Sequence, residues 1–292
     1  MTNRILITIF ALGTLFISCK DEKKQADNIT EADSTKTKNL DIYTSDQYII
    51  ASKGYIRVEA NDNSAKIDSL DFGKSIKIKM AYYDEEGNDE GYLPGENERK
   101  NGYVAVYKTT PKTSSEKPYG YVKEEILVDE YDFKKYKMYF SYPEYMKLTS
   151  AQKRIIIDNG YHEGRSYSIS QNAAKANESI VYGDFDKDGI KDVAITLENL
   201  ENTYGMILVI LNNKATKQPY IAYKKSFTDY LSIRKVKAGG SVQYEDGETD
   251  EGVSNIAVYT FENDGVEILA NAQPFYSIQY SNQTHKFLEH NL

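Results

Sequence analysis

The stretch GDFDKDGIKD, Gly183 to Asp192, has the clearest potential for chemistry in the chain. Counting from Asp184 as position 1, carboxylates fall at positions 1, 3, 5 and 9. Calcium takes about six to eight oxygen ligands, and this alternation turns successive carboxylates toward one ion. Gly189 permits the sharp turn that follows. The spacing predicts a calcium site whose ligands are the side chains of Asp184, Asp186 and Asp188, the carbonyl of Ile190, and Asp192, which binds directly or through water.

The residues after the loop distinguish between the calcium motifs that share this spacing. An EF-hand places a bidentate Glu at position 12 and continues into a helix. Here position 12 is Ile195, inside the strand-like run VAITLE. The segment from Gly183 to Ile195 instead resembles the calcium loop of FG-GAP/VCBS proteins, close to GDFxxDGxxDLxV. That resemblance implies a structural calcium that pins two β-strands, often in extracellular binding and adhesion proteins, and carries over the five ligands named above.

The N-terminus predicts an export signal. Arg4 precedes an apolar run from Ile5 to Ile17, which is too short to span a membrane. Ser18 and Cys19 follow directly and resemble the lipobox of bacterial lipoproteins. The resemblance implies that residues 1–18 are removed as a signal peptide and that Cys19 is lipidated, which makes the membrane a partner. The alternative is an ordinary signal peptide with an incidental cysteine, but Cys19 is the only cysteine in the chain and no disulfide competes for it.

The residues after the cysteine suggest a location. Lys20 stands where inner-membrane lipoproteins of Gram-negative bacteria carry Asp, so the resemblance implies the cell envelope and its outer membrane, with the membrane face left open. Residues 19–40 contain no aromatic residue and many charges, and are predicted to form a disordered tether.

Composition limits the function classes. The net charge is −8, and no basic stripe is visible, which excludes nucleic acid as a partner because binding its phosphates needs clustered Lys and Arg. The chain has 26 Tyr and 10 Phe but no Trp, which favours a mainly β fold.

Residues 41–128 contain short runs of strand character at 55–60, 74–80, 102–108 and 119–127, separated by turn clusters. Their hydrophobic skeleton resembles that of bacterial SH3 (SH3b) domains, which implies a small SH3-like barrel and, commonly, binding of cell-wall peptides. The acidic loop from Tyr82 to Gly102 is longer than the family's. Such domains often accompany a Cys/His peptidase, and the use of Cys19 for the lipid excludes that partner. The skeleton comprises Ile56, Val58, Ile67, Leu70, Phe72, Gly73, Ile76, Ile78, the runs 103–106 and 120–122, Ile126 and Leu127.

The rest of the chain is predicted to be a connector and a second domain. In the connector, residues 129–148, the alternation of Tyr136, Met138 and Phe140 predicts a strand. Residues 149–292 are predicted to form a β-rich α+β domain that holds the calcium loop. Its one short helix begins at Thr149 or Ser150 and stops at Asn159-Gly160. The run Met206 to Leu211 is apolar on both faces and predicts a central strand.

These features predict a non-catalytic, lipid-anchored envelope protein that binds the cell wall (peptidoglycan) or an extracellular polymer or protein. The three histidines lack metalloprotease spacing, and no nucleophile constellation is visible. The alternative is an envelope hydrolase that acts on glycans or wall peptides through acidic residues. A structural subunit of a larger surface assembly is a third hypothesis.

Overall fold

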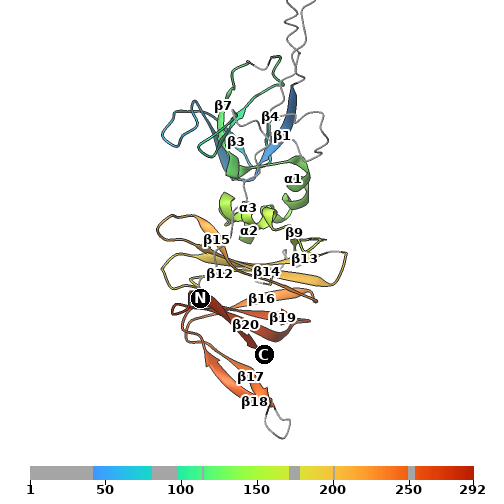
Figure 1. Cartoon of the computed structure of the whole chain (residues 1–292), viewed down its shortest axis with the longest axis vertical. Coiled ribbons are helices and arrows are strands. Elements are labelled where there is room, and N and C mark those ends of the chain that lie inside the picture. Colours follow the sequence, from blue (N-terminus) through green and yellow to red (C-terminus); the bar gives the residue numbers. More distant parts are fainter. Residues whose placement is uncertain (1–41, 81–97, 114, 171–177, 200, 249–253) are drawn as a thin grey trace, which may run out of the picture. The chain divides into compact units, whose positions relative to one another are not determined.

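The fold is mainly β, as predicted (Figure 1). The computed structural model describes residues 42–80, 98–113, 115–170, 178–199, 201–248 and 254–292. They belong to one compact unit, Asp41–Leu292. None of the helices in these ranges is long and apolar enough to cross a membrane. The predicted signal peptide and tether, with Cys19, and most of the acidic loop after Tyr82 lie outside the described residues.

The N-terminal strands form two antiparallel sheets around a core that includes Ile49, Ile56, Val104 and Val122. The first sheet contains, in spatial order, β4 (Ser75–Met80), β1 (Tyr43–Ile49) and β8 (Leu127–Val128). The second contains β3 (Lys66–Asp71), β2 (Lys53–Arg57), β7 (Gly120–Lys123), β6 (Tyr103–Val106) and β5 (Arg99–Lys100).

These sheets do not close into the predicted barrel. Within the described residues, the two sheets are joined by a single bridge between Lys77 and Tyr107. The strand β1, which the sequence pattern did not single out, lies at the centre of the first sheet. It pairs along the whole of β4, from Tyr43 opposite Met80 to Tyr48 opposite Ser75, and so occupies one edge of β4. The four predicted runs all contain strands, and the SH3b relationship stays a prediction.

The connector is helical, so the predicted strand there is wrong. Three α-helices occur in the described residues: α1 (Glu130–Tyr136), α2 (Pro143–Met146) and α3 (Ser150–Asp158). The Asp129 side chain caps α1 by accepting the Asp132 N–H at 2.8 Å. Tyr136 and Phe140 are four residues apart, which places them on one face of helical backbone rather than one face of a strand, and their rings stack at 5.7 Å.

The predicted helix after Thr149 is confirmed as α3. Thr149 and Gln152 form a capping box in which the Thr149 hydroxyl accepts the Gln152 N–H and the Gln152 side chain accepts the Thr149 N–H. The helix ends at Asp158 and Asn159 is its C-cap, which confirms the predicted stop.

The C-terminal region contains two larger sheets and two hairpins. The first sheet has the order β11 (Ser168–Ile169), β13 (Asp192–Asn199), β14 (Tyr204–Asn212) and β15 (Pro219–Phe227), with β12 (Ile180–Gly183) also paired to β13. The second has the order β16 (Leu231–Val236), β19 (Gly265–Ala270), β20 (Gln273–Ser281) and β21 (Lys286–Asn291). The larger hairpin is β17 (Ser241–Glu248) with β18 (Ser254–Thr260), and the smaller one pairs β9 (Tyr161–His162) with β10 (Arg165–Ser166).

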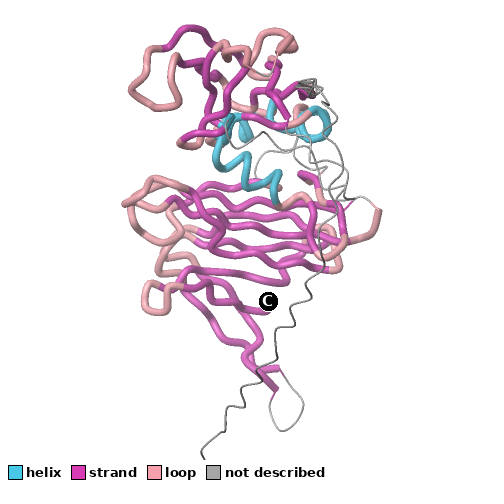
Figure 2. Tube along the Cα trace, turned by 45° about the horizontal axis from the view of Figure 1, so that its top comes forward, coloured by secondary structure: helices cyan, strands magenta, loops and turns pink. Residues whose placement is uncertain are grey.

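The strands β13 and β14 are buried on both faces, which confirms the predicted central strand at Met206 to Leu211. On one face, Val193, Ile195 and Leu208 share a core with the helices, which lie against this side of the sheet (Figure 2). On the other face, Ala194 and Ile207 pack against the second sheet. The helix-side core also contains Ile50 and Val128, so it joins the N-terminal sheets to the C-terminal region: Ile50, Val128, Tyr136, Phe140, Tyr145, Ile156, Ile195 and Leu208 are among its members.

One lysine is buried in this shared core. Lys153 on α3 is 4% exposed, donates to the carbonyl of Ile50 at 3.1 Å, and lies over the rings of Phe72 and Phe140. Burial lowers the pKa of its ammonium group to about 8. The native state therefore binds a proton at Lys153 less readily than the unfolded chain does.

The lowered pKa of Lys153 predicts that its buried charge destabilises the native state by an amount that depends on pH. Below pH 8 the native state carries a buried charge, so replacing the lysine by the similarly long Lys153→Met should stabilise the protein at pH 7. As the pH rises through 8, Lys153 loses its proton in the native state and destabilises the wild type less. The gap in unfolding free energy between Lys153→Met and the wild type should therefore be roughly 2 kcal/mol smaller at pH 9.5 than at pH 7. Urea denaturation at both pH values measures the gap. The exposed control Lys53→Met should show no such change, and an equal gap at both pH values for Lys153→Met would contradict the lowered pKa.

Candidate calcium site

The acidic loop joins two paired strands, as the sequence predicts. β12 ends at Gly183 and β13 begins at Asp192, and these two residues are directly opposite each other in the antiparallel pair. Gly189 has φ +86°, a backbone conformation that glycine adopts without strain. The loop is therefore the turn of a β-hairpin.

The loop gathers three of the predicted ligands. Carboxylate oxygens of Asp184, Asp186 and Asp188 lie within 4.8 Å of one another, and all three side chains are partly exposed. Such a spacing suits oxygens that share one cation with ligand distances of about 2.3–2.6 Å. One oxygen, Asp184 Oδ1, is buried and accepts no hydrogen bond from the described residues. A buried carboxylate oxygen without a partner fits a metal ligand.

Backbone N–H groups bind one oxygen of each of these three carboxylates. Asp184 Oδ2 accepts the Gly189 N–H at 3.0 Å, Asp186 Oδ1 accepts the Asp188 N–H at 3.2 Å, and Asp188 Oδ1 accepts the Ile190 N–H at 2.7 Å. Each of these carboxylates retains a second oxygen that could bind a metal. The three carboxylates thus fix the backbone conformation of the loop in addition to giving it negative charge.

Asp192 lies apart from the group of three. It is fully buried, and its two oxygens accept the N–H groups of Phe185 at 3.0 Å and Asn212 at 2.9 Å. These bonds tie the start of the loop to β13 and the end of β14. The geometry gives Asp192 a role in closing the loop, and its role as a ligand, like that of the Ile190 carbonyl, stays a prediction.

Burial and mutual repulsion act on the loop's charges. Burial raises the pKa of Asp192 to about 7, against the lowering effect of its two backbone hydrogen bonds. Burial and the neighbouring Asp188 raise the pKa of Asp186. A divalent cation would offset the free-energy cost of ionising the carboxylates that it binds, because it favours their charged form.

The loop is anchored to the core by Phe185. Its side chain is fully buried between the two C-terminal sheets, in the core with Ala194 and Val209. A Cβ on Gly183 would lie 2.6 Å from the Phe185 ring, so a glycine is required where the loop leaves β12. The conformation of the loop is thereby coupled to the packing of the core.

Three residues that sequence reasoning missed support the loop. Asp264, from the turn between β18 and β19, accepts the Asp184 N–H at 3.2 Å and the Ala238 N–H at 3.2 Å. Lys214 donates to the carbonyl of Asp188 at 2.6 Å, and the Asn212 side chain donates to the carbonyl of Lys191. None of the three residues belongs to the aspartate motif of the loop. Only Asp264 is marked in the sequence, by the turn residues Asn263-Asp264-Gly265.

No protein-family model, no curated protein and no solved structure matches this chain. The candidate site is therefore defined by its own geometry.

The calcium prediction is tested by thermal melting. A calcium concentration about 100 times Kd stabilises a protein by about 2.7 kcal/mol, which corresponds to a Tm rise of roughly 5–10 °C for a chain of this size. We expect this rise for the soluble chain that begins after Cys19, measured by calorimetry in calcium and in chelator. Asp186→Ala should remove most of the rise because it deletes a central ligand.

The matched control is Asp71→Ala, which removes an exposed carboxylate at the end of β3. It should leave the calcium-dependent rise intact. Identical wild-type melting curves in calcium and in chelator would contradict the site.

Proposed function

We propose that this chain is a non-catalytic, lipid-anchored protein of the bacterial cell envelope, placed at the outer membrane, that binds cell wall or an extracellular polymer or protein. A structural calcium in the acidic loop stabilises its C-terminal region. The main observation behind this proposal is that Asp184, Asp186 and Asp188 lie close together in a hairpin whose Phe185 side chain is buried in the core. Calcium is abundant outside cells, which suits an exported protein that uses it to stabilise a fold.

The hydrogen bonds of the loop support a structural rather than a catalytic role. A general base needs a carboxylate oxygen free to take a proton from a substrate. In this loop Asp192 uses both oxygens for backbone N–H groups, and Asp184, Asp186 and Asp188 each use one. One oxygen from each of Asp184, Asp186 and Asp188 lies within 4.8 Å of the other two, as ligands of a shared cation would.

Wall binding is tested by retention on purified, insoluble peptidoglycan. The soluble chain in calcium buffer should sediment with the polymer, and a known peptidoglycan binder serves as the positive control. The supernatant is analysed for released sugar or peptide at the same time. Failure to sediment while the control binds would contradict the wall-binding function, and steady release of fragments would favour the hydrolase instead.

The lipid anchor is tested by Cys19→Ser in a bacterial host that processes lipoproteins. The wild-type chain should incorporate labelled palmitate and fractionate with the outer membrane, whereas Cys19→Ser should do neither because it lacks the thiol that accepts the lipid. A Ser18→Ala variant keeps a small residue before the cysteine and should behave as wild type. Equal membrane recovery of the wild type and Cys19→Ser would contradict the anchor.

A further inference from the structure

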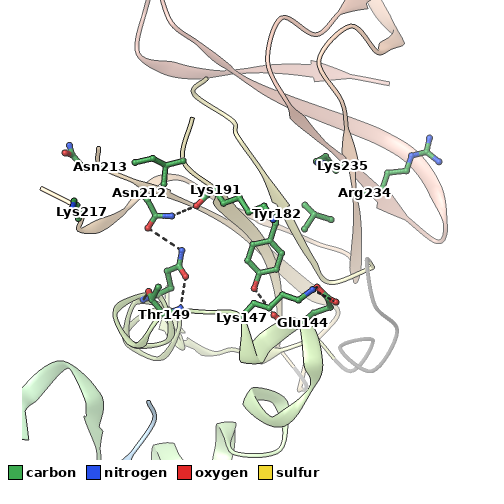
Figure 3. Close-up of a pocket in the computed structure, with 13 residues that line it drawn as sticks. Glu144, Lys147, Thr149, Tyr182, Lys191, Asn212, Asn213, Lys217, Arg234 and Lys235 are labelled. Carbon is green, nitrogen blue, oxygen red and sulfur yellow. Dashed lines mark hydrogen bonds and ion pairs between the residues drawn. The ribbon is translucent and has the colours of Figure 1, made fainter. Parts of the chain in front are cut away.

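A cavity of about 1020 Å³ lies beside the calcium loop (Figure 3). Small-molecule sites range from about 300 to 1,000 Å³, so this cavity has room for several sugar units. Its walls come from α2 and the start of α3, from β12 and the acidic loop, from the turn after β14, and from β16.

The cavity is basic although the chain is acidic. Five cationic side chains and one carboxylate line it, whereas the whole chain has a net charge of −8. The carboxylate, Glu144, pairs with Lys147 at 2.6 Å. The cations are Lys147, Lys191, Lys217, Arg234 and Lys235.

Two of these cations remain without an acidic partner among the described residues. Arg234 pairs with Glu267, and Lys235 lies 3.4 Å from Asp264, so neither brings an uncompensated charge. Lys191 and Lys217 are both exposed and form no ion pair within the described ranges. They lie on separate loops, Lys191 at the end of the acidic loop and Lys217 in the turn before β15. An anion in the cavity would therefore meet two positive charges from different elements.

The turn that carries Lys217 is fixed by hydrogen bonds. The Lys217 N–H donates to the carbonyl of Asn213 at 2.7 Å, and Asn213 Oδ1 accepts the N–H groups of Ala215 and Thr216. These bonds use the oxygen of the Asn213 amide and leave its NH₂ group as a further donor at the cavity wall. Fixed donors bind a ligand with less loss of entropy than mobile ones.

An aromatic ring gives the cavity a second kind of contact. Tyr182 is half-buried, and its hydroxyl donates to the carbonyl of Glu144 at 2.7 Å, which holds the ring in place. In Figure 3 the ring lies between Lys191 and the Glu144–Lys147 pair. An aromatic face is an apolar surface of the kind that packs against the C–H groups of a sugar ring. Val181 and Ile190 add further apolar surface.

We propose that this cavity binds an acidic oligosaccharide, with Lys191 and Lys217 contacting its carboxylate or sulfate groups and Tyr182 packing on a sugar ring. The inference rests on the proposed polymer-binding function and names the class of polymer. A simple anion would use the lysines but not the ring, and a neutral glycan would use the ring but not the lysines. The combination selects a charged sugar.

The test is an array of acidic glycans that carry uronate, sialic acid or sulfate, printed beside their neutral counterparts. The labelled soluble chain in calcium buffer should bind acidic members selectively. The double variant Lys191→Gln/Lys217→Gln should bind them about tenfold or more weakly, since it removes two charge-assisted hydrogen bonds. The control Lys53→Gln/Lys286→Gln loses the same charge at exposed positions outside the cavity and should bind as wild type.

Three results would overturn the inference: no preference for acidic glycans, equal losses in both double variants, or complete competition by inorganic phosphate at the glycan's own concentration. An unchanged calcium-dependent Tm shows that the Lys191→Gln/Lys217→Gln chain is folded. Retention of the wild type on peptidoglycan separates the two proposals. Retention without acidic selectivity overturns this inference and leaves the proposed function standing, whereas failure of both assays removes both.

Discussion

Repulsion between carboxylates in the β12–β13 loop is the constraint that the C-terminal region must satisfy. With oxygens of Asp184, Asp186 and Asp188 inside 4.8 Å, each ionised pair repels by at least about 3 kcal/mol at an effective dielectric constant near 20. Backbone N–H groups offset part of this energy, and a divalent cation would offset the remainder. The loop cannot relax by moving away from the protein, because Phe185 fixes it in the core.

The position of the loop lets this local constraint affect the whole unit. It begins and ends on β12 and β13, and β13 is buried both against the helices and against the second sheet. Asp192 ties the loop to the end of β14, and Asp264 ties it to the turn before β19. Calcium would thus stabilise contacts among elements that are far apart in sequence. The same loop supplies Ile190 and Lys191 to the basic cavity, so the candidate calcium site and the proposed sugar site share a wall.

The sequence predicted what depends on local pattern. The spacing of the aspartates, the strand character on both sides of the loop, the capping residue Thr149 and the two-faced strand at Met206 to Leu211 each follow from neighbours in the chain. The prediction was wrong where one local pattern is compatible with two backbone conformations. Tyr136, Met138 and Phe140 alternate as in a strand, but Tyr136 and Phe140 also lie one helical turn apart, and the buried face of the sheet selects the helix. Asp264, Lys214 and the basic cavity depend on tertiary contacts between distant elements, which no short stretch encodes. The strand β1 likewise takes its place through pairing with β4.

The central claim is that the acidic loop is a calcium site, and a crystal structure of the soluble chain grown with calcium tests it most directly. The account predicts one ion with carboxylate oxygens of Asp184, Asp186 and Asp188 at about 2.3–2.6 Å, and with the buried Asp184 Oδ1 as a ligand. Anomalous scattering from the ion identifies the metal. A loop that contains only water at millimolar calcium, with the three aspartates turned away from one another, would contradict the account.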